Sequence, residues 1–211
     1  RSHTVGPAGR LDPARARGPS HLPAPGADVI VLGRTRGALG GSAYWAEVGR
    51  FVGGQPAVVD LDAELRLQRL LVAAAAEGLL RSAHDCSEGG LLVTLAEAAI
   101  GGPYALEGLG ASCDLGEYAT GMSAEALLYG EDGARAVVSC RSAGAERLEG
   151  LCREHGVPSF RAGRVERASG ELEVAAAGQS FTWSIPVLRK IYFEAIPRRM
   201  RHPDVDRSVG A

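Results

Sequence analysis

The residue types most able to do chemistry lie together at residues 83–90, which read Ala-His-Asp-Cys-Ser-Glu-Gly-Gly, directly before an apolar run at 91–100. We predict that a short strand ends at His84 and Asp85, and that the two glycines open a helix. The first turn of a helix presents free N–H groups and the positive end of the helix dipole, so it suits an anion. The alternative is a capped turn without a ligand, which is the commoner use of a glycine-rich turn.

Within this stretch the candidate residues have different expected roles. Ser87, Gly89 and Gly90 are candidates for contact with a phosphate or nucleotide through main-chain N–H groups, and Ser87 is the expected N-cap. His84 and Asp85 could reach a phosphate or Mg²⁺ at the mouth of a cleft. Their alternative role is structural, because polar residues at strand ends usually satisfy nearby backbone groups.

Composition excludes several classes of function. The formal net charge of −2 gives no reason to expect nucleic acid or an acidic membrane as a partner. No apolar run approaches the roughly 20 residues of a membrane span. The four cysteines lie far apart without a Cys-x-x-Cys pair, so we expect reduced thiols in a cytoplasmic protein and no metal site. The sequence begins with Arg1 rather than Met, and we therefore expect a fragment or a processed piece.

Hydrophobic periodicity and turn residues predict the elements that position these side chains. The expected helices span residues 42–48, 60–78, 89–100, 143–155 and 187–195. The expected strands span residues 28–32, 82–85, 111–115, 126–129, 135–140, 159–162, 171–174 and 181–184. The sequence Asp132-Gly133 favours a hairpin between two of these strands. Strands and helices mix without strict alternation, which predicts an α+β fold, a mixed β-sheet with helices packed on one face.

Several stretches in the same order resemble the last domain of phosphoribosylformylglycinamidine synthase of the PurL type. They are Asp28-Val-Ile-Val-Leu-Gly, Leu39-Gly-Gly-Ser-Ala-Tyr44, Ser82-Ala-His-Asp-Cys-Ser-Glu-Gly-Gly90, Leu128-Tyr-Gly-Glu131, His155-Gly-Val-Pro158 and Gly163-Arg-Val165. The resemblance covers residues 28–196 and implies an AIR-synthase-like C-terminal domain. Residues 1–27 would then be an arm or the ragged end of a preceding domain, and residues 197–211 a polar tail.

The resemblance implies one part of an ATP-dependent ligase of purine synthesis. In that family ATP with Mg²⁺ phosphorylates the oxygen of a substrate amide, and ammonia then displaces the phosphate to give an amidine. The family's catalytic histidine and most of its Mg²⁺ ligands lie in domains that this chain lacks, so we assign no catalytic residue or metal ligand here. The implied partners are the missing ATP-binding domains and, as a candidate source of ammonia, a glutaminase subunit.

One motif departs from the family pattern. The first domain pair of the family has Glu-Ser-Gln where this chain has Glu131-Asp132-Gly133. Glu131 stays a candidate contact for nucleotide or phosphate, but the departure fits a degenerate, structural copy of the substrate-binding turn. Two alternatives therefore remain open: a non-catalytic scaffold or auxiliary nucleotide-binding domain of the same enzyme, and a part of another ATP enzyme of the superfamily.

Two expectations follow for the isolated chain. It should have no activity alone, because the ATP-binding half is missing. It should also expose an apolar patch near residues 37–48, rimmed by Arg34 and Arg36, where the partner domain would pack.

Overall fold

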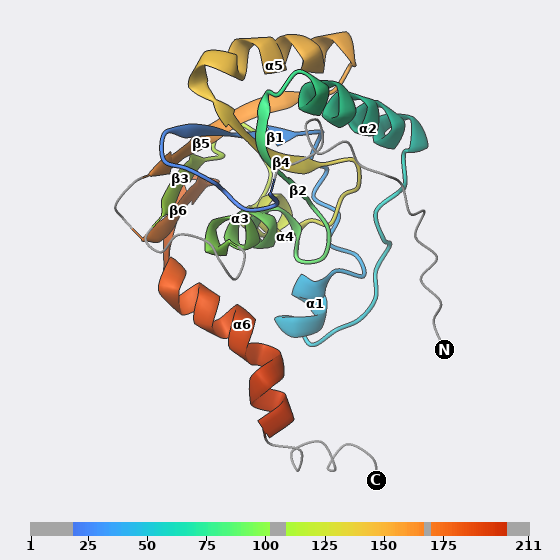
Figure 1. Ribbon diagram of the computed structural model, residues 1–211. Helices are drawn as coiled ribbons and strands as arrows, with labels where there is room; N and C mark the ends of the chain where they lie inside the picture. The colour runs from blue at the N-terminus through green and yellow to red at the C-terminus, as the bar shows by residue number, and fades with distance from the viewer. Residues whose placement is uncertain (1–18, 102–108, 167–169, 202–211) are drawn as a thin grey trace.

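The computed structural model describes residues 19–101, 109–166 and 170–201, and its described part is built on a seven-stranded mixed sheet (Figure 1). The strand order is β2-β4-β1-β5-β3-β6-β7, and only the β3–β6 pair is parallel. The strands are β1 (Ala27–Leu32), β2 (Leu80–Asp85), β3 (Gly110–Asp114), β4 (Ala136–Arg141), β5 (Ser159–Glu166), β6 (Glu171–Ala176) and β7 (Gln179–Ser184). The helices are α1 (Ala43–Glu47), α2 (Leu61–Ala76), α3 (Gly90–Ile100), α4 (Ala124–Tyr129), α5 (Ser142–Glu154) and α6 (Ile185–Arg201).

Helices cover both faces of this sheet. Successive side chains of a strand point to opposite faces, so Val29 and Val31 of β1 pack into a core with α3 and α4, while Ile30 and Leu32 pack into a second core with α2 and α5. In Figure 1, α2 and α5 lie above the sheet and α3 and α4 below it. The α+β class and the mixed sheet are confirmed, but the expectation that the helices pack on one face is wrong. The physical reason is that β1 is buried along its whole length, as strands covered on both faces are.

The segment 126–129 is a helix and not the expected strand. Ser123 accepts a hydrogen bond from the N–H of Ala126 and so caps α4. Leu127 and Leu128 are buried in the core beneath α3. Because α4 precedes β4, the turn at Asp132-Gly133 joins a helix to a strand and forms no hairpin.

Other local expectations agree with the structure. Asp60 caps α2 through a hydrogen bond from the N–H of Ala63, and Ser42 caps α1.

The last helix is longer than expected, since α6 continues through Pro197 to Arg201 and projects from the body of the molecule (Figure 1). Most of the expected arm and tail, residues 1–18 and 202–211, lies outside the described residues, and the proposed domain limits stay predictions.

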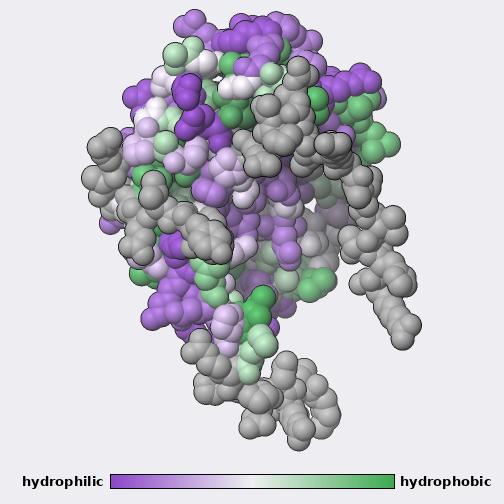
Figure 2. Space-filling model, in the orientation of Figure 1, coloured by the Kyte–Doolittle hydropathy of each residue, from purple (hydrophilic) through white to green (hydrophobic). Residues whose placement is uncertain are grey.

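A run of exposed apolar side chains near the predicted patch lies further along the chain than expected. It comprises Trp45, Val48, Phe51, Val52, Val58, Val59 and Leu61, and we call this stretch the 45–61 apolar segment; other exposed apolar side chains lie on α2 and α6. It overlaps the predicted 37–48 region only at its start. In the orientation of Figure 1, hydrophobic surface is visible over α1 and along α6 (Figure 2).

Candidate functional site

The glycine turn before α3 is held by other parts of the protein. Gly89 is the N-cap of α3 in a left-handed conformation, and Ser87 does not cap the helix as expected. The Ser87 hydroxyl instead donates to Oδ2 of Asp85 over 2.8 Å, and this hydrogen bond is the main cause that lowers the pKa of Asp85. The N–H of Gly90 donates to the carbonyl of Ser87. The turn is therefore ordered by its own residues as well as by the contact described next.

The carboxylate of Glu131 joins this turn to the glycine loop after β1. Its Oε1 accepts from the N–H of Gly89 over 2.8 Å and from the N–H of Ala43 over 2.8 Å. Gly89 is the N-cap of α3 and Ala43 is the first residue of α1, so one carboxylate lies at the start of two helices, where negative charge is favoured. At the α3 N-terminus, where the sequence predicts a bound anion, the protein's own Glu131 carboxylate accepts the hydrogen bond from Gly89.

His84 and Asp85 lie beside this contact. The side chain of His84 is only 15% exposed and lies between two carboxylates, with Nε2 3.4 Å from Glu97 and Nδ1 3.5 Å from Asp85. The Asp85 side chain is 80% exposed. The structure therefore brings Glu131 and Gly89 into direct contact, joins Asp85 to Ser87 within the same turn, and pairs His84 with Glu97 and Asp85. Ligand binding by these residues stays a prediction.

A buried polar network behind Glu131 fixes the loop after β1. Oδ2 of Asp132 accepts from the N–H groups of Arg36 and Gly37, each over 2.8 Å, and from the Thr35 hydroxyl. Arg135 is 3% exposed and donates to the Thr35 hydroxyl over 2.8 Å. From the sequence Asp132 is expected to be a turn residue, and neither Asp132 nor Arg135 is assigned to this network, although the turn Gly-Glu-Asp-Gly followed by an arginine is the available signal.

A cleft lined by arginines opens at the same end of the sheet, on the side of α2. Its volume is about 260 Å³, and Arg34, Arg36 and Arg66 line it together with Asp60. Arg36 lies 3.5 Å from Asp60, and the charges of Arg66 and Arg36 contribute to the lowered pKa of Asp60, whose largest cause is the hydrogen bond from Ala63. Sequence reasoning assigned this cleft no function.

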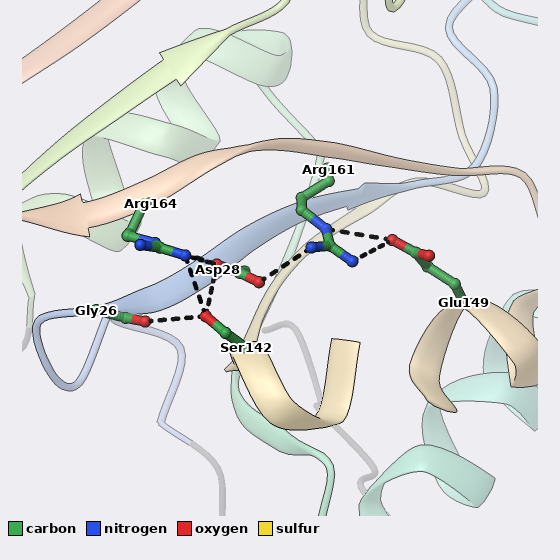
Figure 3. Close-up of polar contacts among 6 residues, drawn as sticks. All are labelled: Gly26, Asp28, Ser142, Glu149, Arg161 and Arg164. Atoms are coloured by element: carbon green, nitrogen blue, oxygen red, sulfur yellow. Dashed lines mark hydrogen bonds and ion pairs between the residues drawn. The ribbon is translucent and has the colours of Figure 1, made fainter. Parts of the chain in front are cut away.

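A second charged cluster lies at the other end of β1 (Figure 3). The buried Asp28 carboxylate accepts from the Ser142 hydroxyl over 2.9 Å and from Arg164, while its Oδ2 lies 3.6 Å from Arg161 and accepts no hydrogen bond among the described residues. Arg161 also pairs with Glu149 of α5. These contacts tie β1 and β5 to the start of α5, which is a structural role.

The cysteines are buried and free. Burial raises the pKa of Cys113 to about 12 and that of Cys140 to about 11. Burial also raises the pKa of Cys86 and Cys152. A thiol with a raised pKa stays protonated near neutral pH and is a poor nucleophile, so the arrangement does not support cysteine catalysis.

Two features are absent from the residues that the structure describes. Residues 19–101, 109–166 and 170–201 contain no helix that is long and apolar enough to cross a membrane. In the same ranges no group of three or more His, Cys, Asp or Glu side chains is placed to hold a metal ion.

Comparison with known proteins gives consistent results. A family model described as "AIR synthase related protein, C-terminal domain" matches residues 24–175. The chain is 43% identical over 162 residues to the phosphoribosylformylglycinamidine synthase subunit PurL of Thermobifida fusca, covering 76% of this chain and 20% of that protein. It is 36% identical over 197 residues to the subunit PurL of Leifsonia xyli, covering 92% of this chain and 25% of that protein. The chain thus spans a quarter or less of the length of these relatives.

A solved structure has the same fold. The protein described as "T. maritima PurL complexed with ATP" superposes with a TM-score of 0.64 at 22% sequence identity, covering 82% of this chain and 27% of that chain. Together with the sequence relatives, this likeness confirms the resemblance that the motifs suggested.

Proposed function

Because the chain belongs to the family of AIR synthase related proteins, C-terminal domain, we propose that it is the C-terminal part of a PurL-type phosphoribosylformylglycinamidine synthase. In this proposal the complete enzyme is an ATP-dependent, amidine-forming ligase of purine synthesis, and the chain is inactive alone. Its proposed partners are the other domains of the same enzyme, with a glutaminase subunit as the source of ammonia. We place the enzyme in the cytoplasm, and its four free thiols support that location.

One observation carries this proposal. Three motifs of the family resemblance, at residues 39–44, 82–90 and 128–131, are far apart in the sequence, and the Glu131 carboxylate joins them through the N–H groups of Ala43 and Gly89. Residues that a PurL-type domain would use together therefore lie together at one end of the sheet. That end carries the loop after β1, the turn after β2 and the turn before β4, since Leu32, Asp85 and Ala136 are in register there.

ATP and Mg²⁺ belong to the proposed enzyme as a whole. The described residues hold no side-chain group that fits a metal ion, so we derive no step through Mg²⁺ in this chain. The role of Glu131, Asp132 and Arg135 is structural, because they hold the loop after β1 and the turn before α3 in fixed positions. A loop held in this way can present a rigid surface to a neighbouring domain that carries the reacting groups.

A second candidate function is favoured by the same contact. The N–H of Gly89 is taken by Glu131 and that of Gly90 by Ser87, so part of the expected anion cradle is already filled from within. This favours a non-catalytic scaffold domain of the synthase, in agreement with the change from Glu-Ser-Gln to Glu131-Asp132-Gly133. The alternative of another ATP enzyme of the superfamily has no such observation in its support.

A complementation experiment separates these possibilities. The 211-residue chain would be assayed for ATP hydrolysis and amidine formation, with complete Thermobifida fusca PurL as the positive control. A Thermobifida fusca PurL truncated to remove the segment matching residues 28–196 would then be assayed with and without the added chain. We expect no turnover by the chain alone, no turnover by the truncated protein, and partial recovery when both are present.

The outcomes have distinct meanings. Turnover by the chain alone would overturn its proposed dependence on other domains. Full activity of the truncated protein without the chain would mean that this segment is dispensable for the reaction. If the chain restores activity and nucleotide titration finds no binding to the chain itself, the scaffold role is the correct one.

A further inference from the structure

We propose that the cleft lined by Arg34, Arg36 and Arg66 is a binding site for the phosphate group of a small molecule. The proposal does not depend on the proposed function, because it concerns binding by this chain and requires no ligase activity. It also differs from the predicted site at the α3 turn, which lies on the opposite face of the sheet.

The charge of the cleft is its first supporting feature. Three arginines and one aspartate line it, so its side chains carry a net formal charge of +2. Arg34 makes no ion pair or hydrogen bond with any other residue that the structure describes. The nearby carboxylates already accept from the backbone, Asp60 from Ala63 over 2.9 Å and Glu64 from Ala134 over 2.5 Å. An incoming phosphate would therefore find arginine donors that the protein's own acids do not saturate.

Close backbone contacts fix the wall of the cleft at Gly33. Gly33 has a φ of +91°, and a Cβ on it would lie 2.1 Å from the carbonyl oxygen of Ala134, so no side chain fits at this wall. The N–H of Gly33 donates to the carbonyl of Pro158 over 2.8 Å. The first turn of the 16-residue helix α2 forms another side of the cleft through Asp60 and Ala63, and its dipole adds to the positive potential there. A volume of about 260 Å³ accommodates a phosphate group.

A neighbouring hollow favours a phosphate ester over free phosphate. It has a volume of about 220 Å³ and shares Gly33, Arg34 and Pro158 with the arginine cleft. Tyr118 and Phe160 line it, with ring centroids 5.3 Å apart. An organic group attached to a phosphate held by Arg34 would reach these rings. Both candidate ligands, a phosphate ester and free phosphate, would place a phosphate group next to the arginines.

Calorimetric titration of the whole 211-residue chain tests the proposal. The probes are inorganic phosphate and phenyl phosphate, with acetate and chloride as controls at the same ionic strength. We expect one saturable site for phosphate and no comparable site for acetate. Tighter binding of phenyl phosphate would identify the ester as the source, and equal binding would identify free phosphate.

Substitutions place the site. Arg34→Gln and Arg66→Gln should each weaken phosphate binding about tenfold, as expected for loss of a charged hydrogen-bond donor. Arg69→Gln is the matched control, since Arg69 is exposed on the same helix but does not line the cleft. Asp60→Asn keeps an oxygen that can cap α2 and removes the only lining carboxylate, so it should tighten binding. Thermal melting without phosphate would verify that every variant is folded.

Three results would each overturn the proposal. They are the absence of saturable binding of both phosphate probes, equal binding of acetate, and unchanged phosphate affinity in Arg34→Gln and Arg66→Gln. An effect of Arg69→Gln as large as theirs would also count against it, because general surface charge would then account for the binding.

Discussion

Gly90 is the residue whose substitution should damage the α3 turn most. It has a φ of +70°, and a Cβ on it would lie 2.7 Å from the backbone of Tyr129. We expect Gly90→Val to destabilise the protein by about 3–5 kcal/mol, because the strain of a left-handed side chain adds to a clash with rigid backbone. The expected fall in Tm is roughly 10 °C or more for a domain of this size, measured by thermal melting followed by circular dichroism.

Cys86→Ser is the matched comparison for this prediction. Cys86 lies in the same turn and is also buried. A serine is nearly the same size as the cysteine and requires no change of backbone, so the loss should be under about 2 kcal/mol. Equal melting temperatures for Gly90→Val and the unaltered protein would show that the turn is not a tight packing point.

Glu131 gives a second prediction at the level of single residues. Glu131→Ala leaves the N–H groups of Gly89 and Ala43 without their acceptor, and we expect a loss of about 2–4 kcal/mol in the free energy of unfolding. Glu131→Gln keeps one side-chain oxygen and should cost less than half as much. Urea unfolding measures both, and Glu146→Ala, at an exposed position of α5, is the control. If Glu131→Ala were as stable as the control, the carboxylate would not be what joins the two loops.

At the level of elements, the cap of α2 predicts a dependence on pH. The hydrogen bond from Ala63, followed by the charges of Arg66 and Arg36, holds the pKa of Asp60 below its usual value of 3.8. A lowered pKa in the folded state means that this stabilisation is complete above pH 3.8 and is lost as the pH falls through the lower folded value. Asp60→Ala should therefore lower Tm at pH 7, and the difference from the unaltered protein should shrink in strong acid.

Asp62→Asn is the control for the pH prediction. Asp62 lies in the same first turn of α2 but makes no side-chain hydrogen bond within the described ranges. From pH 7 to pH 2 the Tm difference from the unaltered protein should shrink for Asp60→Ala and should be small throughout for Asp62→Asn. A constant difference between Asp60→Ala and the unaltered protein over the whole range would argue against the charged cap.

The elements also show where sequence reasoning succeeds and where it stops. The helix α2 was predictable because a capping aspartate precedes leucines at helical spacing. The helix α4 was not, because Ala126–Tyr129 is a short apolar run whose period does not distinguish helix from strand. The burial of β1 on both faces had a usable signal in the continuous run Val29–Leu32, which is typical of strands covered on both sides.

The candidate site was only partly predictable for a different reason. The residue types at 84–90 and 131 are visible in the sequence, but the bond between Gly89 and Glu131 spans 42 positions. Such a contact is set by the register of β2 and β4 and by the packing of α3 on α4, which no local pattern encodes. The arginine cleft is hidden from sequence reasoning for the same reason, since Arg34 lies in the loop after β1 and Arg66 on α2, and the two meet only in the folded chain.

At the level of the whole molecule, the 45–61 apolar segment should be covered by other domains of the proposed enzyme. Val52 is 83% exposed and Val58 is 71% exposed, and exposed apolar patches usually mark an interface. We expect Val52→Asp and Val58→Asp to leave the Tm of the chain unchanged and to weaken its association with truncated Thermobifida fusca PurL. Calorimetric titration of the two proteins would measure that association.

The control for the interface is Val72→Asp. Val72 is 70% exposed on α2 and lies outside the segment. If Val72→Asp weakened association as much as Val52→Asp, or if Val52→Asp had no effect, the segment would not be the contact surface.

The central place of β1 in the sheet has a consequence for how the protein is made. The strand at residues 27–32 pairs only with β4 and β5, which come later in the chain and end at Arg141 and Glu166. Until β4 has been synthesised this apolar segment has no strand partner, and until β5 follows it has a partner on one side alone. Pairings so distant in sequence form slowly. The nascent chain must therefore carry a strongly apolar strand without its full set of partners until residue 166 has been synthesised, and in that interval aggregation and capture by chaperones compete with folding.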